Sequence, residues 1–259
     1  MHSISGFKPI VALSLVLALV PVSVLAETAV ESNVDIRLTL AFQAREGDLQ
    51  SWLPAPWQVN PVTAGPSKGA NLFVVFIQNL LRQTPDSKLS ESSGTARAVA
   101  LAVPAKHPQT GEESTFVTRI YTTDHASLPG PYKNSTKADV RRELVLKGEN
   151  LEPGYGSDNW EMKEASGGTI LVRFTYQRSL PVRAKIEQKP RSAVEPNFYR
   201  IYRVDLGVEL VKSVPAGIDR LQSYEFRSTV PELAKLFDGT AQLVSITASP
   251  WYVRQVSLP

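Results

Sequence analysis

Short stretches in which apolar and polar residues alternate run through most of this sequence. From Val34 to Phe42, apolar side chains at every second position alternate with Asp35, Arg37 and Thr39, a pattern typical of a strand with one buried face. We expect this strand to lie at an edge of a sheet. The ten predicted strands are 34–42, 71–80, 95–103, 115–123, 137–146, 160–165, 169–178, 198–214, 221–226 and 241–248. Turn-forming residues bound nearly all of them, and Gly167-Gly168 indicates a two-residue hairpin.

Helix is expected only in short segments. The pattern predicts one from Pro231 to Phe237, where Thr229 and Glu232 have the spacing of a capping box and Gly239 is a stop signal. A second is predicted from 45 to 52. Because helical crossovers are missing, the strands should pair mostly antiparallel. The sequence therefore predicts a mainly β fold, a single curled antiparallel barrel or double sheet of about ten strands with two or three short helices.

The first 26 residues read as a secretory signal. Lys8 is followed by an apolar run from Ile10 to Leu25 that ends in small residues at Ala26. Pro21 interrupts the run and no basic cluster follows it, so cleavage after Ala26 is favoured over a membrane anchor. Residues 27–259 are then expected to form one domain in the periplasm or outside the cell, with no stable membrane insertion. Segments 84–93, 106–114 and 185–195 read as surface loops of that domain.

Composition argues against several classes of function. The chain has no cysteine, which excludes disulfides, a thiolate nucleophile and cysteine-bound metal. The net charge is +3 and cations are mixed with acids, so nucleic acid is not an expected partner. His107 and His125 stand alone, so no metal site is expected. Glycine loops that hold phosphates or dinucleotides are absent, so no cofactor is expected. The pattern Gly65-Pro-Ser-Lys-Gly69 lacks the strand-to-helix setting of a hydrolase serine.

Two arginines share the apolar face of their strands. Arg97 lies on the face of Val99 and Leu101, and Arg142 lies on the face of Val140 and Leu144. A buried guanidinium needs an anion, and the two alternatives are a bound acid and an internal partner such as Glu161 or Glu164. The candidate ligand-binding residues are Arg97, Arg142, Arg119, Trp57 and Tyr121, with Trp52 as a further aromatic residue at the mouth of the sheet.

The order of these pieces resembles the acetoacetate decarboxylase-like superfamily. The resemblance is carried by Leu53-Pro54, the strand from Ala98 to Pro104, the strand from Phe116 to Asp124, the turn from Gly130 to Val140 and the closing residues 239–259. It implies a curled β-barrel around a small-molecule cavity. It also implies a lysine that forms a Schiff base with a β-keto acid, which requires a neutral amine.

Lys137 is the residue onto which the resemblance places this lysine, and Lys133 is the alternative. The family has two adjacent lysines, whereas here the nearest cations to Lys137 are four residues away, at Lys133 and Arg141. The family's glutamate falls near Ala98, which can neither accept a hydrogen bond nor move a proton. Alternation along the strand also places Lys137 on the polar face, with Asp139 and Arg141. The residues therefore give less support to decarboxylation than to the fold.

Two main hypotheses follow. The first is an exported lyase that acts on a small keto or carboxylic acid through Lys137. The second is a non-catalytic exported barrel that binds a small acidic or hydrophobic ligand, as lipocalins do. A structural or protein-binding role in the cell envelope is the remaining alternative. The sequence gives no indication of ligand identity or oligomeric state.

Overall fold

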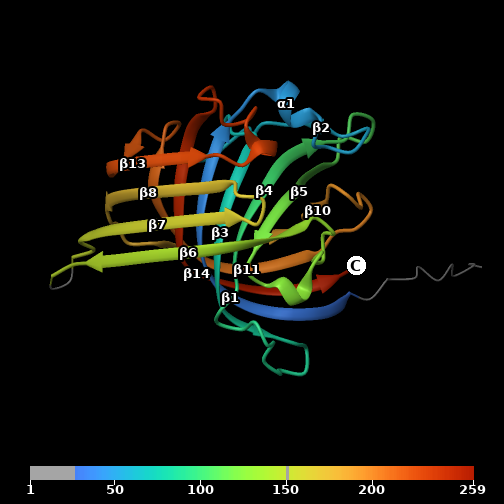
Figure 1. The fold of residues 1–259 in the computed structure, drawn as a ribbon, viewed down its shortest axis with the longest axis horizontal. Helices are drawn as coiled ribbons and strands as arrows, with labels where there is room; N and C mark the ends of the chain where they lie inside the picture. Colours follow the sequence, from blue (N-terminus) through green and yellow to red (C-terminus); the bar gives the residue numbers. More distant parts are fainter. Residues whose placement is uncertain (1–26, 150–151) are drawn as a thin grey trace, which may run out of the picture.

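The computed structural model describes residues 27–149 and 152–259, so the predicted signal segment lies outside the described residues. The chain forms one large curled sheet with very little helix (Figure 1). Its main strands are β1 (Thr28–Gln43), β3 (Leu72–Gln83), β4 (Arg97–Lys106), β5 (Glu113–Thr122), β6 (Ser135–Lys147), β7 (Tyr155–Glu164), β8 (Thr169–Gln177), β11 (Ile201–Ser213), β13 (Leu221–Ser228) and β14 (Gln242–Leu258). Each overlaps one of the ten predicted strands, although β7 begins five residues before and β14 ends ten residues after the predicted bounds.

Four further strands were not predicted as such: β2 (Gln58–Val59), β9 (Val182–Gln188), β10 (Arg191–Ser192) and β12 (Ile218–Asp219). Segment 185–195, predicted as a loop, therefore begins in a strand, because β9 pairs antiparallel with β11 along Tyr202–Val208. The prediction missed it because most β9 side chains are exposed and its residues are charged at alternate positions.

The strand order is β12-β11-β14-β1-β3-β4-β5-β6-β7-β8-β13. Most pairs are antiparallel, but β6 runs parallel to β5 and β10 runs parallel to β5, so the sheet is mixed. It is curled but does not close as a barrel, which corrects the predicted closure. The prediction that the first strand lies at an edge is also wrong, since β1 pairs with β14 on one side and β3 on the other.

The curl brings two parts of the sheet face to face. Strands β6, β7, β8 and β13 form a front layer that crosses in front of a back layer of β14, β1, β3, β4 and β5 (Figure 1). The main core fills the space between the layers. From the front layer it receives Trp160, Met162 and Phe174, and from the back layer Leu40 and Phe76, all at most 1% exposed. Burial of this much apolar surface is the dominant stabilising contribution.

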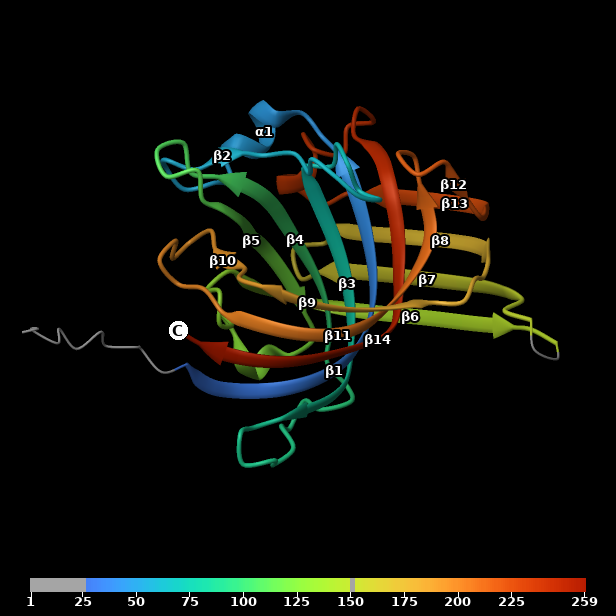
Figure 2. The same cartoon turned by 180° about the vertical axis from the view of Figure 1, so that it is seen from behind.

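A second, smaller core lies where the long strands bend. Strands β1, β11 and β14 turn sharply in their lower halves (Figure 2), and register shifts between Asp35 and Arg37 and between Leu206 and Glu209 mark the bends. Bulges of this kind kink a strand and re-aim its side chains. Tyr202 and Tyr252 pack there with Tyr132, whose hydroxyl lies 2.5 Å from that of Tyr202.

Within residues 27–149 and 152–259, helical structure is limited to three short pieces: α1 (Glu46–Gln50) and the 3-10 turns η1 (His125–Ser127) and η2 (Pro231–Leu233). The predicted helix at 45–52 is confirmed by α1. The predicted helix from Pro231 to Phe237 shortens to η2, and no capping box forms, because Thr229 bonds to Thr169 and Glu232 points elsewhere. The predicted β7–β8 hairpin is confirmed, but its turn spans residues 165–168 and is longer than the two residues predicted at Gly167-Gly168.

Candidate functional site

The segment that joins β13 to β14, residues 229–241, covers the opening between the two layers, and we call it the cap. Val230, Leu233 and Leu236 of the cap are at most 2% exposed and belong to the main core. On one side Arg45, which precedes α1, donates to the carboxylate of Asp238 at 2.9 Å and to the carbonyl of Lys235 at 3.1 Å. The cap is therefore held in place by apolar packing and by the polar contacts of Arg45.

A second polar contact joins the cap to β5. Tyr121 donates its hydroxyl to Oε1 of Glu232 at 2.5 Å, and Nε of Arg119 donates to Oε2 of the same carboxylate at 2.7 Å. Burial, with Glu232 and Glu164 nearby, raises the pKa of the Tyr121 phenol well above its usual range, so this hydroxyl remains a donor. The guanidinium of Arg119 lies 4.8 Å over the Trp52 ring.

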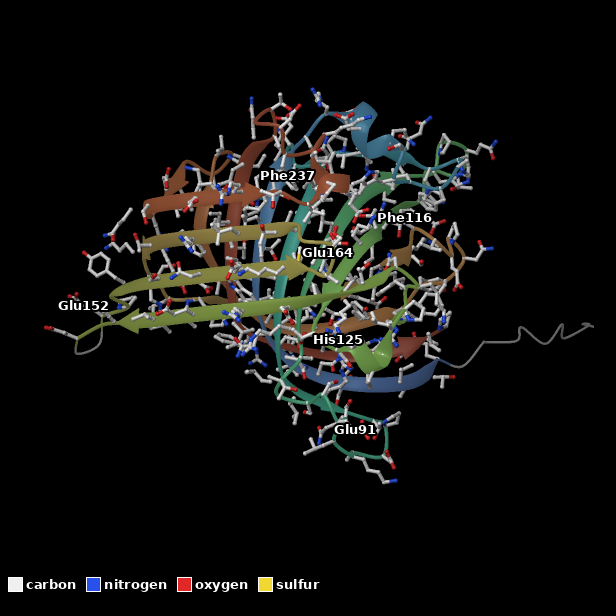
Figure 3. All side chains as sticks on the ribbon, viewed as in Figure 1. Glu91, Phe116, His125, Glu152, Glu164 and Phe237 are labelled. Atoms are coloured by element: carbon white, nitrogen blue, oxygen red, sulfur yellow. The ribbon has the colours of Figure 1, made fainter. Side chains whose placement is uncertain are left out.

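The structure thus brings together two of the predicted ligand-binding residues, Arg119 and Tyr121, with the aromatic residue Trp52. Their partner Glu232 was missed, because the sequence pattern assigned it to a helix cap. The residues around Glu232 in the sequence give no indication of its partner, because Tyr121 lies more than a hundred positions away. Glu164 is the last residue of β7 and its charge acts on Tyr121. Figure 3 shows Glu164 near the middle of the molecule and Phe237 above it.

An apolar pocket of about 320 Å³ lies under the other side of the cap, and we call it the seam pocket. It lies between β13, whose second edge has no partner strand among the described residues, and the paired ends of β1 and β14. Three rings form its wall: Phe42, Phe226 and Phe237, with centroids 4.9 to 5.5 Å apart. Its other lining residues are Tyr224, Arg227, Ser228, Gly239, Ala241 and Leu243.

Two hydroxyls in the wall of the seam pocket are buried without a partner. Neither Oη of Tyr224 nor Oγ of Ser228 forms a hydrogen bond with any described residue. Burial alone raises the pKa of the Tyr224 phenol well above its usual range, so it is a hydrogen-bond donor. An unsatisfied buried hydroxyl costs roughly 1–3 kcal/mol, which a suitable ligand would recover. The pocket therefore has a mainly apolar wall whose residues include two with buried, unpaired hydroxyls.

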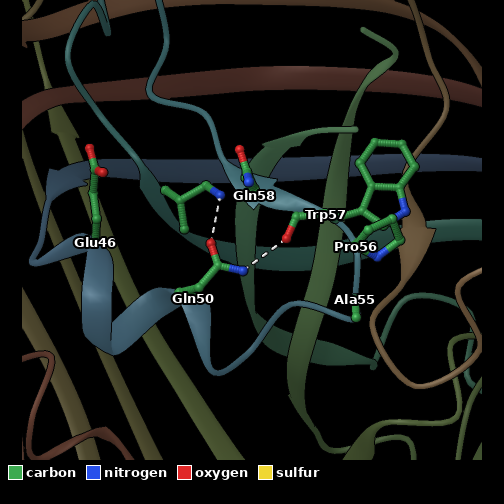
Figure 4. A pocket seen from close by; sticks show the side chains of 7 residues that line it. Glu46, Gln50, Ala55, Pro56, Trp57 and Gln58 are labelled. Carbon is green, nitrogen blue, oxygen red and sulfur yellow. Dashed lines mark hydrogen bonds between the residues drawn. The ribbon is translucent and has the colours of Figure 1, made fainter. Parts of the chain in front are cut away.

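A second depression, of about 450 Å³, lies on the surface between α1 and β2 (Figure 4). The amide of Gln50 shapes it by donating to the carbonyl of Trp57 at 2.8 Å and accepting from the backbone N–H of Val59 at 3.1 Å. Trp57, a predicted ligand-binding residue, is 7% exposed and packs edge-on against Phe116 and His107. Its burial is accounted for by core packing.

The two arginines predicted on apolar strand faces lie between the layers. Arg142 donates to Asp158 through Nε at 2.9 Å and Nη2 at 2.8 Å, and to Gln78 through Nη1 at 3.1 Å. The expectation of an internal partner is confirmed, but the partner is Asp158 and not Glu161 or Glu164. Arg97 lies opposite Gln78 in the sheet, and its Nε is buried without a partner in the described part of the chain.

The lysines lie on the outside. Lys137 is exposed on the outer face of β6 with Asp139 and Arg141, while its neighbour Ala138 is 2% exposed and faces the core. Lys133 is also exposed. Within residues 27–149 and 152–259 every lysine is exposed except Lys212, which is half-buried and pairs with Asp219. In the same residues no cluster of three or more potential metal ligands occurs, and no helix has the length and hydropathy of a membrane span.

Comparison with known proteins shows the fold. No protein-family profile and no curated protein matches the sequence. Among solved structures, the enduracididine biosynthesis enzyme MppR, complexed with the condensation product of pyruvate and imidazole 4-carboxaldehyde, matches with a TM-score of 0.56 at 11% identity, over 97% of this chain and 96% of that one. An acetoacetate decarboxylase-like enzyme from Sphingomonas wittichii RW1 matches with a TM-score of 0.54 at 12% identity, over 93% and 96%.

Acetoacetate decarboxylase from Legionella pneumophila matches with a TM-score of 0.53 at 13% identity, over 93% of this chain and 91% of that one. The chain therefore has the acetoacetate decarboxylase-like fold, and the resemblance seen in the sequence is confirmed in the fold. At these identities the similarity shows the fold alone, since one fold hosts many chemistries.

Proposed function

We propose that this chain is an exported, non-catalytic protein of the acetoacetate decarboxylase-like fold that binds a small amphipathic molecule in the seam pocket. The single observation that carries the proposal is the pair of buried, unpartnered hydroxyls of Tyr224 and Ser228 in the lining of a pocket that also contains three aromatic rings. The apolar body of a ligand would pack against the rings, and a carbonyl or carboxylate at its end would accept hydrogen bonds from the hydroxyls. Ligands named with the MppR structures are also small molecules.

The fold also supports a second candidate, a lyase that acts through a Schiff base on Lys137. A Schiff-base lysine needs a neutral amine, and burial is one of the two usual means of obtaining it. Lys137 lies on the exposed face of its strand, and Ala138 occupies the adjacent inward position. These positions favour binding over catalysis.

The binding proposal is tested by calorimetric titration of the mature chain with acetophenone and with phenylacetate. For acetophenone we expect one site, whose affinity Tyr224→Phe weakens about tenfold, the loss of one hydrogen bond of roughly 1.4 kcal/mol. Phe237→Ala should weaken binding further. Tyr155→Phe is the matched control, because Tyr155 is 52% exposed and does not line the pocket. If neither acetophenone nor phenylacetate gave a binding signal, the proposal would be contradicted.

Borohydride trapping distinguishes the lyase candidate from the binding proposal. The chain is incubated with acetoacetate and borohydride, and the intact mass is measured. We expect no adduct. An adduct that mapped to Lys137, and that disappeared in Lys137→Met, would establish the lyase instead.

A further inference from the structure

Tyr121 and Arg119 meet the two oxygens of one carboxylate from fixed positions. The hydroxyl of Tyr121 and Nε of Arg119 approach Oε1 and Oε2 of Glu232 separately, at 2.5 and 2.7 Å. Charge-assisted hydrogen bonds of this kind are among the stronger polar contacts in proteins. The geometry is that of a carboxylate-binding fork.

The two donors keep their positions by contacts that do not involve Glu232. The Tyr121 ring is 1% exposed and packs in the main core. Nη1 of Arg119 donates to the carbonyl of Thr118 at 2.7 Å, and its guanidinium lies over the Trp52 ring. The fork is therefore preorganised by β5 and by the segment after α1, which lowers the cost of binding any carboxylate that replaces Glu232.

The acceptor is held much more loosely than the donors. Glu232 lies on a three-residue turn and its side chain is 39% exposed, as is 32% of the Arg119 side chain. Water and salt weaken an ion pair at this exposure. Losing the contact would not release the cap, because Asp238 still pairs with Arg45 and Leu233 and Leu236 stay in the core.

We propose that Arg119 and Tyr121 form a binding site for the carboxylate of a small acid, and that Glu232 of the cap occupies this site when no acid is bound. The site is separate from the seam pocket and does not depend on the function proposed for it. Glu164, whose charge also acts on Tyr121, disfavours a second negative charge nearby. The site therefore selects small monocarboxylates over dicarboxylates.

The test removes the internal competitor. Acetate and propionate are titrated into the wild-type chain and into Glu232→Ala, with binding followed by calorimetry and by the chemical shifts of the methyl protons of the probe. We expect the affinity of Glu232→Ala to be about tenfold higher than that of the wild type, since the site no longer has to be vacated. Tyr121→Phe in the Glu232→Ala background should lose most of this gain, and acetamide should not bind.

Asp238→Ala is the matched control, because it breaks a different polar contact of the cap, the ion pair with Arg45, without touching the fork. Its acetate affinity should equal that of the wild type. An unchanged or lower affinity in Glu232→Ala, or an equal gain in Asp238→Ala, would overturn the proposal and leave Glu232 as a structural contact. Phe237→Ala should weaken acetophenone but not acetate, so failure at one site is distinguishable from failure at the other.

Discussion

Arg142 and Asp158 form a two-pronged ion pair in the interior between the two layers, with side chains 5% and 2% exposed. Gln78 of the back layer accepts a third hydrogen bond from the guanidinium, which also lies 4.8 Å over the Trp160 ring. The pair thus ties β6 and β7 of the front layer to β3 of the back layer.

Replacing Asp158 should strongly destabilise the fold. Asp158→Ala leaves a buried guanidinium without its anion, and removal of one member of a buried pair typically costs about 3–5 kcal/mol. Chemical denaturation of the two chains measures the difference. Asp139→Ala, on the exposed face of β6, is the control and should change the free energy of unfolding by less than about 0.5 kcal/mol. A loss under about 1 kcal/mol for Asp158→Ala would contradict the role assigned to the pair.

Replacement by alanine should affect two of the glycines differently. A Cβ at Gly156 would lie 2.5 Å from the Tyr176 ring, so Gly156→Ala must displace a buried aromatic side chain and should cost about 1–3 kcal/mol. Gly47 in α1 has nothing within 4 Å of its added Cβ, so Gly47→Ala should be neutral or stabilise by up to about 1 kcal/mol. Thermal melting compares them. Equal shifts would show that contact with Tyr176 does not constrain position 156.

The sequence predicted the strands well because their signal is local. Alternation places Val99 and Leu101 in the core, and the structure buries both completely. The same rule correctly placed Arg142 inside and Lys137 outside. It could not identify Asp158, because the strand prediction began at Trp160 and omitted the first half of β7.

The cap was the part least accessible to prediction. Thr229 and Glu232 have the spacing of a capping box, and the pattern is satisfied equally by a helix or by side chains that bond to distant strands. The structure has the second arrangement, since Glu232 forms a hydrogen bond to β5 and Thr229 forms one to β8. The prediction of a closed barrel was wrong for a similar reason. The pattern of a strand shows which of its faces is buried, but it does not show whether the two edge strands of the sheet pair with each other.

Stability should fall at alkaline pH as buried tyrosines ionise. Burial, and then the carboxylates of Glu209 and Asp158, raise the pKa of Tyr176 to about 12, above the value of about 10 in an unfolded chain. Between these values the unfolded chain loses the proton and the folded chain keeps it, so this contribution is fully present below about pH 10 and is lost as the pH rises through about 12. Tyr176→Phe should therefore show a shallower fall in melting temperature over that range.

The control for this effect is Tyr155→Phe, since Tyr155 is exposed. Its melting temperature should follow the wild type at every pH. If Tyr176→Phe also followed the wild type between about pH 10 and 12, the ionisation of Tyr176 would have no part in alkaline unfolding.

Phe237 should govern the local stability of the cap. Its ring contacts Phe42 and Phe226, and Phe237→Ala removes both contacts, at a cost of roughly 2 kcal/mol for a half-buried ring. Hydrogen exchange should then accelerate at the backbone amides of Leu236 and Phe237, which bond to Leu233. Amides of β3 should be unaffected. Uniform acceleration throughout the sheet would indicate global and not local destabilisation.

The sharp bends in β1 and β14 have a consequence for how the molecule comes apart. Each of these strands places side chains in the main core above the bend, such as Leu40 and Ile246, and in or against the second core below it, such as Val30 and Tyr252. If either core unfolded, β1 and β14 would lose their structure there, and the other core is built on the same two strands. The two cores therefore denature together, in one cooperative transition, although each has its own set of packed rings.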